Sequence, residues 1–202
     1  MICIIDYGVG NLFSLTSSFN AIGQEIIVSG EEKVIKNADK LILPGVGAFG
    51  DASKKLISSG LDKVVIEQVK KGIPLMGVCL GMQMLFEKSY EYGEFNGLGL
   101  LKGSVVPIDL PKKYKIPHIG WNALNFKKDS PLLKYINEKD CVYFVHSYHA
   151  IDCDHSLIAT TEYGKEITAI VGNGNVYGCQ FHPEKSGDVG LKILKAFSEL
   201  GE

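Results

Sequence analysis

The first half of the chain alternates short apolar runs with amphipathic segments, and this alternation restricts the fold more than any other feature. Four apolar runs predict strands, at Ile2–Asp6, Gln24–Val28, Lys40–Leu43 and Pro74–Val78. Between them, apolar side chains at helical spacing predict helices at Asn11–Ala21, Asp51–Ser59 and Leu61–Lys70. Strands that alternate with helices pair in parallel through right-handed crossovers, with helices on both sheet faces. We therefore predict an α/β fold of three layers, α/β/α, with a mixed, mostly parallel central sheet.

The second half of the chain predicts shorter connections between its strands. The strand candidates are Gly103–Ile108, Val142–His146, Leu157–Thr161, Thr168–Val171 and Val176–Gln180. The Asn173-Gly174 pair is a hairpin signal, so part of this half is expected to pair antiparallel. A closing helix is predicted at Val189–Leu200, whereas the Gly, Pro and Lys content of Tyr90–Asp140 predicts long loops. We find no internal repeat, and we expect a single domain over residues 1–202.

Composition excludes several classes of protein. The formal net charge of −2 lacks the basic excess that nucleic-acid binding needs. No apolar run approaches the roughly 18 residues that span a bilayer, and the first residues lack the basic start of a signal peptide. The five cysteines form no Cys-x-x-Cys pair and their number is odd, which argues against a disulfide framework or a zinc site. We expect a cytoplasmic protein without membrane or nucleic-acid partners.

The segment Pro74–Gln83 carries the first chemical signal. An apolar strand is followed directly by a helix-capable segment, and Gly77 and Gly81 flank Cys79 at minus two and plus two. This is the spacing of a nucleophile elbow, in which a sharp turn holds the reactive side chain clear of the sheet and at a helix N-terminus. That terminus favours a thiolate, and the N–H of Leu80 faces a developing oxyanion. The alternative is an ordinary buried thiol, so a second signal is needed.

The second signal follows the last predicted strand, in the run Phe-His-Pro-Glu. Pro183 favours an extended His182, and alternate residues of an extended segment face the same side, so Glu184 is placed to orient the imidazole. A Cys–His pair oriented by a carboxylate is a general form of the catalytic triad. Alone, His182 is equally consistent with a surface or capping histidine.

A third signal is the glycine-rich run Leu41–Gly50. Glycines after a strand let backbone amides approach a ligand, so this loop is a candidate for the second oxyanion donor. It lacks the Gly-Lys-Ser/Thr of a phosphate-binding loop, and a plain tight turn is the alternative.

These segments resemble class I glutamine amidotransferases over nearly the whole chain. Within that class they resemble the glutaminase subunits of imidazole glycerol phosphate synthases, of histidine biosynthesis. The matching segments are Ile5–Asn11, Leu43–Gly50, Gly77–Gln83, Pro117–Asn122, Val145–Tyr148 and Gln180–Ser186. The Cys and His-Pro-Glu segments are shared by the whole class. The Asp-Tyr-Gly-Val-Gly-Asn, Pro-Gly-Val-Gly and Pro-His-Ile-Gly-Trp-Asn segments are more specific to the histidine-pathway subunits.

The resemblance implies a flavodoxin-like fold and a role for each matching residue. The catalytic residues are Cys79 as nucleophile, His182 as acid and base, and Glu184 as its orienting partner. The implied binding residues are Gly47 and Leu80 as oxyanion donors, with Gln83, Ser147 and Tyr148 at the substrate, L-glutamine. The implied partner contacts are Trp121, Asn122 and Lys185. The partner is a (β/α)8-barrel synthase subunit that forms a heterodimer with the glutaminase and receives its ammonia. The reaction needs no metal and no organic cofactor.

Three alternatives stay open at the sequence. His149 stands where the resemblance predicts another aromatic residue, and paralogues of this kind supply ammonia to sugar-modifying synthases. A cysteine hydrolase or peptidase on a related sheet, or a subunit that keeps the fold without catalysis, would share the same elbow.

Overall fold

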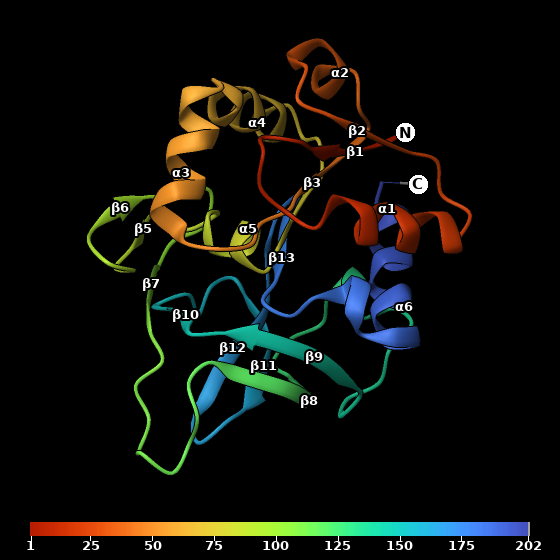
Figure 1. The fold of residues 1–202 in the computed structure, drawn as a ribbon. Helices are drawn as coiled ribbons and strands as arrows, with labels where there is room; N and C mark the ends of the chain where they lie inside the picture. Colours follow the sequence, from red (N-terminus) through yellow and green to blue (C-terminus); the bar gives the residue numbers. More distant parts are fainter. Residues whose placement is uncertain (202) are drawn as a thin grey trace.

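The computed structural model describes residues 1–201, which fold around one nine-stranded sheet (Figure 1). Its strand order is β2 (Ile26–Ser29), β1 (Ile2–Ile5), β3 (Lys40–Leu43), β4 (Leu75–Val78), β13 (Val176–Cys179), β12 (Glu166–Asn173), β11 (Leu157–Glu162), β8 (His118–Phe126) and β9 (Cys141–His146). Neighbouring strands from β2 to β13 pair in parallel, and those from β13 to β9 pair antiparallel. The mixed sheet predicted from the sequence is therefore present.

Helices cover both faces of the parallel half. One face carries α1 (Leu12–Ala21) and α6 (Gly187–Ser198), and the other carries α2 (Glu32–Lys36), α3 (Phe49–Ser58) and α4 (Leu61–Lys70) (Figure 1). Strand β3 shows why the layers form. Its side chains alternate between faces, so Leu41 and Leu43 join the core under α3 and α4 while Ile42 joins the core under α1 and α6.

A second, smaller sheet closes one side of the functional site. Its strand order is β10 (Tyr148–Ile151), β7 (Ser104–Pro107), β5 (Lys88–Ser89) and β6 (Phe95–Asn96). Only Ser147 separates β9 of the large sheet from β10 of the small one. The chain therefore changes sheets at Ser147, and this places residues 146–148 between the two sheets.

Three short helical turns complete the described elements, α5 (Leu80–Gln83), η1 (Pro131–Leu133) and η2 (Pro183–Lys185). Most predicted elements lie within a few residues of the observed ones. The prediction of loops over Tyr90–Asp140 is wrong, because this region holds β6 and the nine-residue strand β8. Burial alternates at the start of β8, but the exposed positions there are the apolar Ile119 and Trp121, so the hydropathy of the segment does not read as a half-buried strand.

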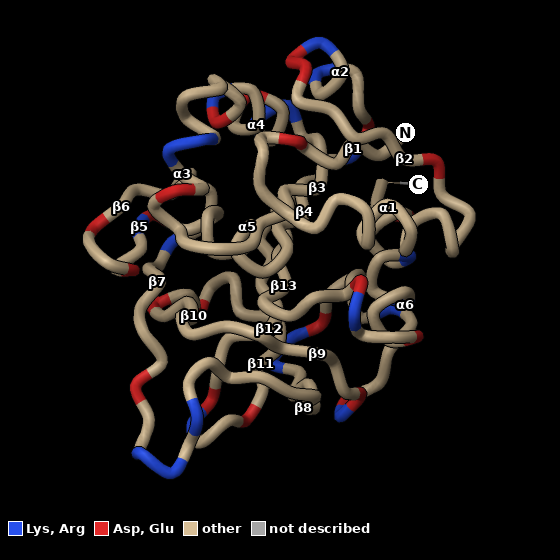
Figure 2. The backbone as a smooth tube through the Cα atoms, in the orientation of Figure 1, with Lys and Arg blue, Asp and Glu red and all other residues tan. Residues whose placement is uncertain are grey.

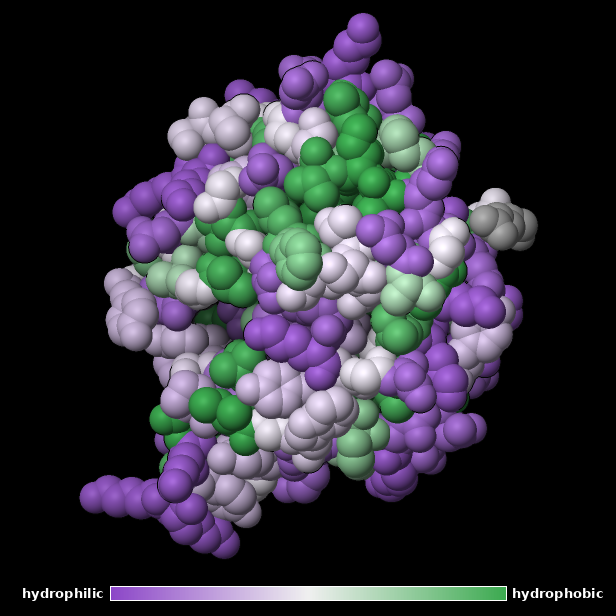
Figure 3. All heavy atoms as spheres, turned by 45° about the vertical axis from the view of Figure 1, so that its right-hand side comes forward, coloured by the Kyte–Doolittle hydropathy of each residue, from purple (hydrophilic) through white to green (hydrophobic). Residues whose placement is uncertain are grey.

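Charged residues of both signs lie at the periphery, and β4 and β13 in the centre carry none (Figure 2). The face drawn in Figure 3 shows hydrophobic patches separated by hydrophilic side chains. Within residues 1–201, no helix has the length and apolar character needed to cross a bilayer. The same residues contain no cluster of three or more His, Cys, Asp or Glu side chains arranged for a metal ion.

His149, which stands where the resemblance predicts another aromatic residue, affects the stability of the fold. His149 on β10 is 4% exposed, and neither ring nitrogen has a hydrogen-bond partner among residues 1–201. Burial, helped by the charge of Lys165, lowers the pKa of His149 from 6.5 to about 4. Because the unfolded ring titrates near pH 6.5, the neutral ring favours the folded state above that pH, and this contribution is lost as pH falls toward 4.

We therefore expect His149→Phe to stabilise the protein more at pH 5 than at pH 8. The substitution should raise the free energy of unfolding by about 2 kcal/mol more at pH 5 than at pH 8, since each pKa unit is worth about 1.4 kcal/mol. Urea denaturation at both pH values measures it. His155→Gln, at an exposed histidine, is the control. Equal effects of His149→Phe at the two pH values would contradict the assignment of a buried neutral ring.

Candidate active site

The turn between β4 and α5 has the geometry of a nucleophile elbow. Cys79 adopts a φ of 54° and a ψ of −110°, a backbone conformation that residues other than glycine rarely adopt. A Cβ added at Gly77 would lie 2.5 Å from the carbonyl oxygen of Gly81. A Cβ added at Gly81 would collide with the carbonyl oxygen of Leu43. Both flanking positions therefore require glycine, as the spacing predicts.

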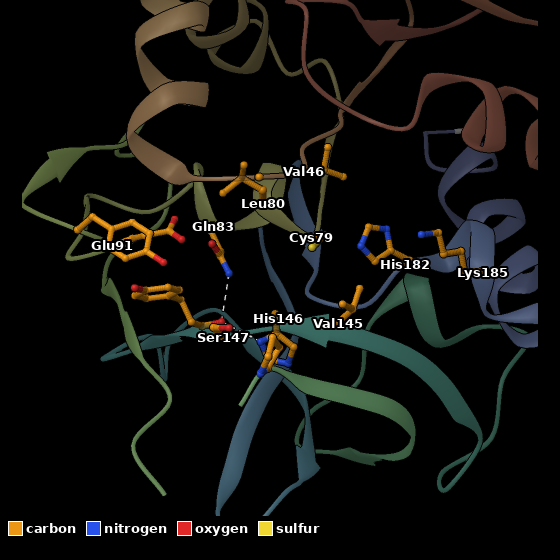
Figure 4. Close-up of a pocket in the computed structure, with 14 residues that line it drawn as sticks. Val46, Cys79, Leu80, Gln83, Glu91, Val145, His146, Ser147, His182 and Lys185 are labelled. Atoms are coloured by element: carbon orange, nitrogen blue, oxygen red, sulfur yellow. Dashed lines mark hydrogen bonds between the residues drawn. The ribbon is translucent and has the colours of Figure 1, made fainter. Parts of the chain in front are cut away.

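The Cys79 side chain lies just past the end of β4 and is nearly buried. Cys79 is only 7% exposed, yet it lines a cavity of 330 Å³ at the carboxyl ends of the parallel strands (Figure 4). The amide Nε2 of Gln180 lies 3.8 Å from its sulfur. Helix α5 is four residues long, so the helix terminus is a weaker source of positive charge than predicted.

His182 and Glu184 meet as predicted, but by a different backbone path. Nδ1 of His182 lies 2.8 Å from Oε1 of Glu184, and the two side chains are 4% and 1% exposed. The extended segment predicted here is wrong beyond His182, because Pro183–Lys185 forms the 3-10 turn η2. Figure 4 shows the imidazole turned toward the sulfur of Cys79.

The electrostatics favour a charged imidazole. Burial alone would lower the pKa of His182, but its hydrogen bonds with Cys79 and Glu184 outweigh burial and raise the pKa to about 10. At neutral pH His182 is therefore an imidazolium that faces the Cys79 sulfur, which is the charge arrangement that a Cys–His nucleophile pair uses. Burial raises the pKa of Cys3, Cys153 and Cys179, so these thiols stay protonated.

Two free backbone amides line the same cavity. Gly47 follows β3 with a φ of +87°, and Leu80 begins α5. Within residues 1–201, neither N–H donates to another backbone group. Unused N–H donors beside a nucleophile are what a developing oxyanion requires.

The positions predicted for glutamine line the cavity together with the nucleophile. Gln83, Ser147 and Tyr148 are all among its walls. Gln83 is 4% exposed, and its Nε2 donates to the carbonyl oxygen of Tyr148 at 3.1 Å and to Oε1 of Gln180 at 3.0 Å. The Gln83 amide nitrogen is thus already engaged by the protein, and only its oxygen remains for a substrate.

Sequence reasoning missed Glu91, which is the carboxylate among the residues that line the cavity. Its Oε2 accepts a 2.6 Å hydrogen bond from the backbone N–H of Phe49, and burial raises its pKa. Tyr92 and His146 are further lining residues without a predicted role. Glu91 lies among other acidic residues of a segment predicted as loop, so no local signal distinguished it.

The residues predicted to face a partner do not all lie together. Lys185 lines the cavity, whereas Trp121 and Asn122 lie on β8 outside it. Trp121 is 56% exposed, with its ring centroid 6.0 Å from that of Tyr143. Asn122 is partly exposed and bonds to the ring of His118 at 2.8 Å.

A profile of the family described as "Glutamine amidotransferase class-I" matches residues 3–199. The chain belongs to the class I glutamine amidotransferase family. It is 55% identical over 199 residues to the "Imidazole glycerol phosphate synthase subunit HisH" of Lactococcus lactis subsp. lactis (strain IL1403), covering 98% of both chains. It is 50% identical to the protein of the same name from Aquifex aeolicus (strain VF5), covering 98% of this chain and 96% of the relative.

Solved structures of the family share the fold. A "Crystal structure of glutamine amidotransferase" superposes with a TM-score of 0.76 at 19% identity, covering 98% of both chains. The "Structure of PurLQS from Thermotoga maritima" gives a TM-score of 0.75 at 22% identity, covering 98% of this chain and 96% of that one. The predicted α/β class and the predicted family are both confirmed.

Proposed function

We propose that this class I amidotransferase is the glutaminase subunit of an imidazole glycerol phosphate synthase, with Cys79, His182 and Glu184 as its catalytic residues. The observation that supports the assignment of residues is the buried imidazole of His182, which contacts Glu184 at 2.8 Å and is turned toward Cys79 on a strained elbow. Full-length identity of about half to proteins named as HisH subunits supports the pathway.

The reaction follows from these positions. The Cys79 thiolate attacks the side-chain amide carbon of glutamine, and the carbonyl oxygen becomes an oxyanion. The N–H groups of Gly47 and Leu80 stabilise it, each contributing about 3–4 kcal/mol. The tetrahedral intermediate collapses as His182 gives its proton to the leaving nitrogen, releasing ammonia and a glutamyl thioester on Cys79. His182 then takes a proton from water, which attacks the thioester and yields glutamate and the thiolate.

The cavity also fits the amino-acid end of glutamine. The α-ammonium group needs an anionic partner in a partly buried site, and Glu91 is the carboxylate on the cavity wall. The Phe49 N–H holds that carboxylate in place. Gln83, Ser147 and Tyr148 form the wall beside it. We assign these four side chains and their backbone to glutamine binding.

The partner is proposed to be a (β/α)8-barrel subunit that uses the ammonia on a nucleotide substrate in the cytoplasm. Lys185 at the cavity and the exposed Trp121 and Asn122 on β8 are proposed to face it. No metal or organic cofactor enters the proposed reaction, because every charge that develops has a partner among this chain's own groups.

Glutamate release by the purified chain, alone and with the barrel subunit and its nucleotide substrate, tests the proposal. We expect slow release by the chain alone and a marked increase when the partner and nucleotide are present. Cys79→Ser with the same partner is the control for contaminating glutaminase. Stimulation by a sugar-modifying synthase in place of the barrel subunit would contradict the pathway, and no release under any condition would contradict the chemistry.

A further inference from the structure

A continuous set of hydrogen bonds leads away from the nucleophile. Nε2 of Gln180 faces the Cys79 sulfur at 3.8 Å, and Oε1 of Gln180 accepts from Gln83 at 3.0 Å. Nε2 of Gln83 also donates to the carbonyl oxygen of Tyr148 at 3.1 Å. Tyr148 lines the cavity and directly follows the point where the chain changes sheets.

The set continues through two buried histidines to the surface of β8. Nδ1 of His146 lies 2.8 Å from the Tyr148 carbonyl oxygen, and its Nε2 lies 3.0 Å from Nδ1 of His118. Nε2 of His118 lies 2.8 Å from the Asn122 side-chain oxygen, and Nδ2 of Asn122 donates to the Glu162 carbonyl oxygen at 3.1 Å. Four contacts thus join the cavity wall to the exposed residue Glu162.

Packing holds the two rings in place. His118 is fully buried between two aromatic rings, with centroid distances of 4.9 Å to Phe144 and 4.0 Å to Tyr163. His146 is 7% exposed and lines the glutamine cavity. The stacked ring of His118 cannot rotate freely, and His146 is held by contacts at both of its ring nitrogens. What can still change in the pair is where its hydrogens lie.

A count of hydrogens shows that the contacts cannot all be satisfied at once by neutral rings. The set ends on carbonyl oxygens at Tyr148 and Glu162, which only accept. With the Asn122 oxygen toward His118, the three contacts made by ring nitrogens need three hydrogens, and two neutral imidazoles carry two. Burial lowers the pKa of both rings, that of His146 to about 3, so the pair is neutral at pH 7.

Two neutral arrangements remain, and they differ at both ends. If Asn122 turns its NH2 toward His118, then His118 Nδ1–H donates to His146 and His146 Nδ1–H donates to the Tyr148 carbonyl oxygen. If Asn122 keeps its oxygen toward His118, both rings carry the hydrogen on Nε2, and the Tyr148 carbonyl oxygen loses that donor. The amide orientation is an assignment that the hydrogen-bond network itself must decide.

We infer that His118 and His146 are positioning residues that form a two-state tautomer relay between Asn122 on β8 and the Tyr148 carbonyl of the glutamine cavity. The relay rests on the proposed function only in that Tyr148 belongs to a glutamine site. In switching to the second state, the partly exposed Asn122 amide rotates, and one proton enters at His118 Nε2 from the water that this rotation admits beside β8. The shared proton passes from His118 Nδ1 to His146 Nε2, and one proton leaves His146 Nδ1 to water in the cavity. The net charge of the pair is unchanged.

Through the relay, a partner bound at the surface of β8 can affect the glutamine site without touching it. When Asn122 donates to His118, its own oxygen faces the Glu162 carbonyl, which leaves two acceptors together at a solvated surface. A partner group that donates a hydrogen bond there stabilises this state, and with it the bond from His146 to the Tyr148 carbonyl. Binding at the surface of β8 thereby holds the cavity wall in place.

Nitrogen-15 NMR of the imidazole rings tests the relay without any assay of activity. We expect both rings of the free wild-type protein at pH 7.5 to be neutral, with hydrogen on Nε2, because Asn122 turns its oxygen toward His118. Adding the barrel subunit is expected to move the hydrogen of both rings to Nδ1. Asn122→Asp puts an acceptor-only group at the surface end, so in that variant His146 should keep the Nε2–H form when the barrel subunit is added. A wild-type His146 ring that does not change on binding, or a pair that gains a third hydrogen, would overturn the inference.

A matched pair of variants provides the functional test. His118→Phe keeps a ring in the aromatic stack and cuts the relay, and we expect the KM for glutamine to rise about fivefold, as for one lost hydrogen bond, with kcat little changed. His149→Phe makes the same substitution at a buried histidine that has no hydrogen-bond partner in the described part of the chain, residues 1–201, and it should leave KM unchanged. Equal KM values in the two variants would refute a positioning role for His118, whereas loss of all activity in the wild-type protein would bear on the proposed function instead.

Discussion

Cys79→Ser is expected to abolish glutamine hydrolysis while the variant still binds its partner. A serine hydroxyl does not ionise near neutral pH, so it cannot form the thiolate–imidazolium pair that His182 supports. The change is nearly isosteric, and Cys79 lies at the cavity, away from Trp121 and Asn122. Removing a nucleophile lowers kcat on the order of 10⁴-fold or more. Glutamate release and co-purification with the barrel subunit measure the two expectations.

Cys141→Ser is the matched control for this variant. Cys141 is an exposed free thiol at the start of β9, so the same substitution there should leave turnover unchanged. Normal turnover by the Cys79→Ser variant would show that residue 79 is not the nucleophile. Loss of partner binding along with activity would show that the substitution disturbs the fold instead of the chemistry.

His182→Asn is also expected to lose nearly all glutaminase activity. Asparagine cannot hold the proton that the leaving ammonia needs, and it removes the positive charge that faces the thiol. We expect kcat to fall by about 10³-fold or more, the scale of losing a general acid and its charge together. His155→Asn, at an exposed histidine, serves as the control. Substantial turnover by His182→Asn would remove His182 from the acid and base role.

The pH dependence of the wild-type enzyme belongs to the same prediction. The pKa of His182 is raised to about 10, so the imidazolium is present across neutral pH and is lost as pH rises through that value. Turnover should therefore fall on the alkaline side, toward pH 10, and not near pH 6.5 where a free histidine titrates. Steady-state rates from pH 6 to 10.5 with saturating glutamine measure this, with enzyme stability checked at each pH.

Local chemistry explains which parts of the site the sequence could predict. The sharp turn at Cys79 is predictable because a Cβ at Gly77 or Gly81 would collide with backbone atoms, so glycine at both positions indicates the turn. The proximity of Cys79 and His182 is predictable only because both sequence motifs are recognisable. In the fold, parallel pairing of β4 with β13 is what brings the two residues together. The resemblance added the glutamine positions, which no local rule distinguishes.

The features that the sequence did not predict depend on packing between distant segments. Glu91 gains its place from the N–H of Phe49, 42 positions earlier in the chain. The hydropathy of β8 does not alternate as in a half-buried strand, because the exposed positions at one end of it are the apolar Ile119 and Trp121. The relay of His118 and His146 depends on the antiparallel register of β8 with β9, which sets these two residues directly opposite each other.

One thiol, Cys79, is proposed to attack glutamine. Mass spectrometry of proteolytic peptides after reaction with a glutamine-mimicking electrophile, followed in time beside glutaminase activity, identifies the attacking residue. We expect one label per chain, on the peptide that contains Cys79, with activity lost in proportion and with protection by free glutamine. Labelling of Cys141 or another residue while activity is lost and Cys79 stays unmodified would contradict it.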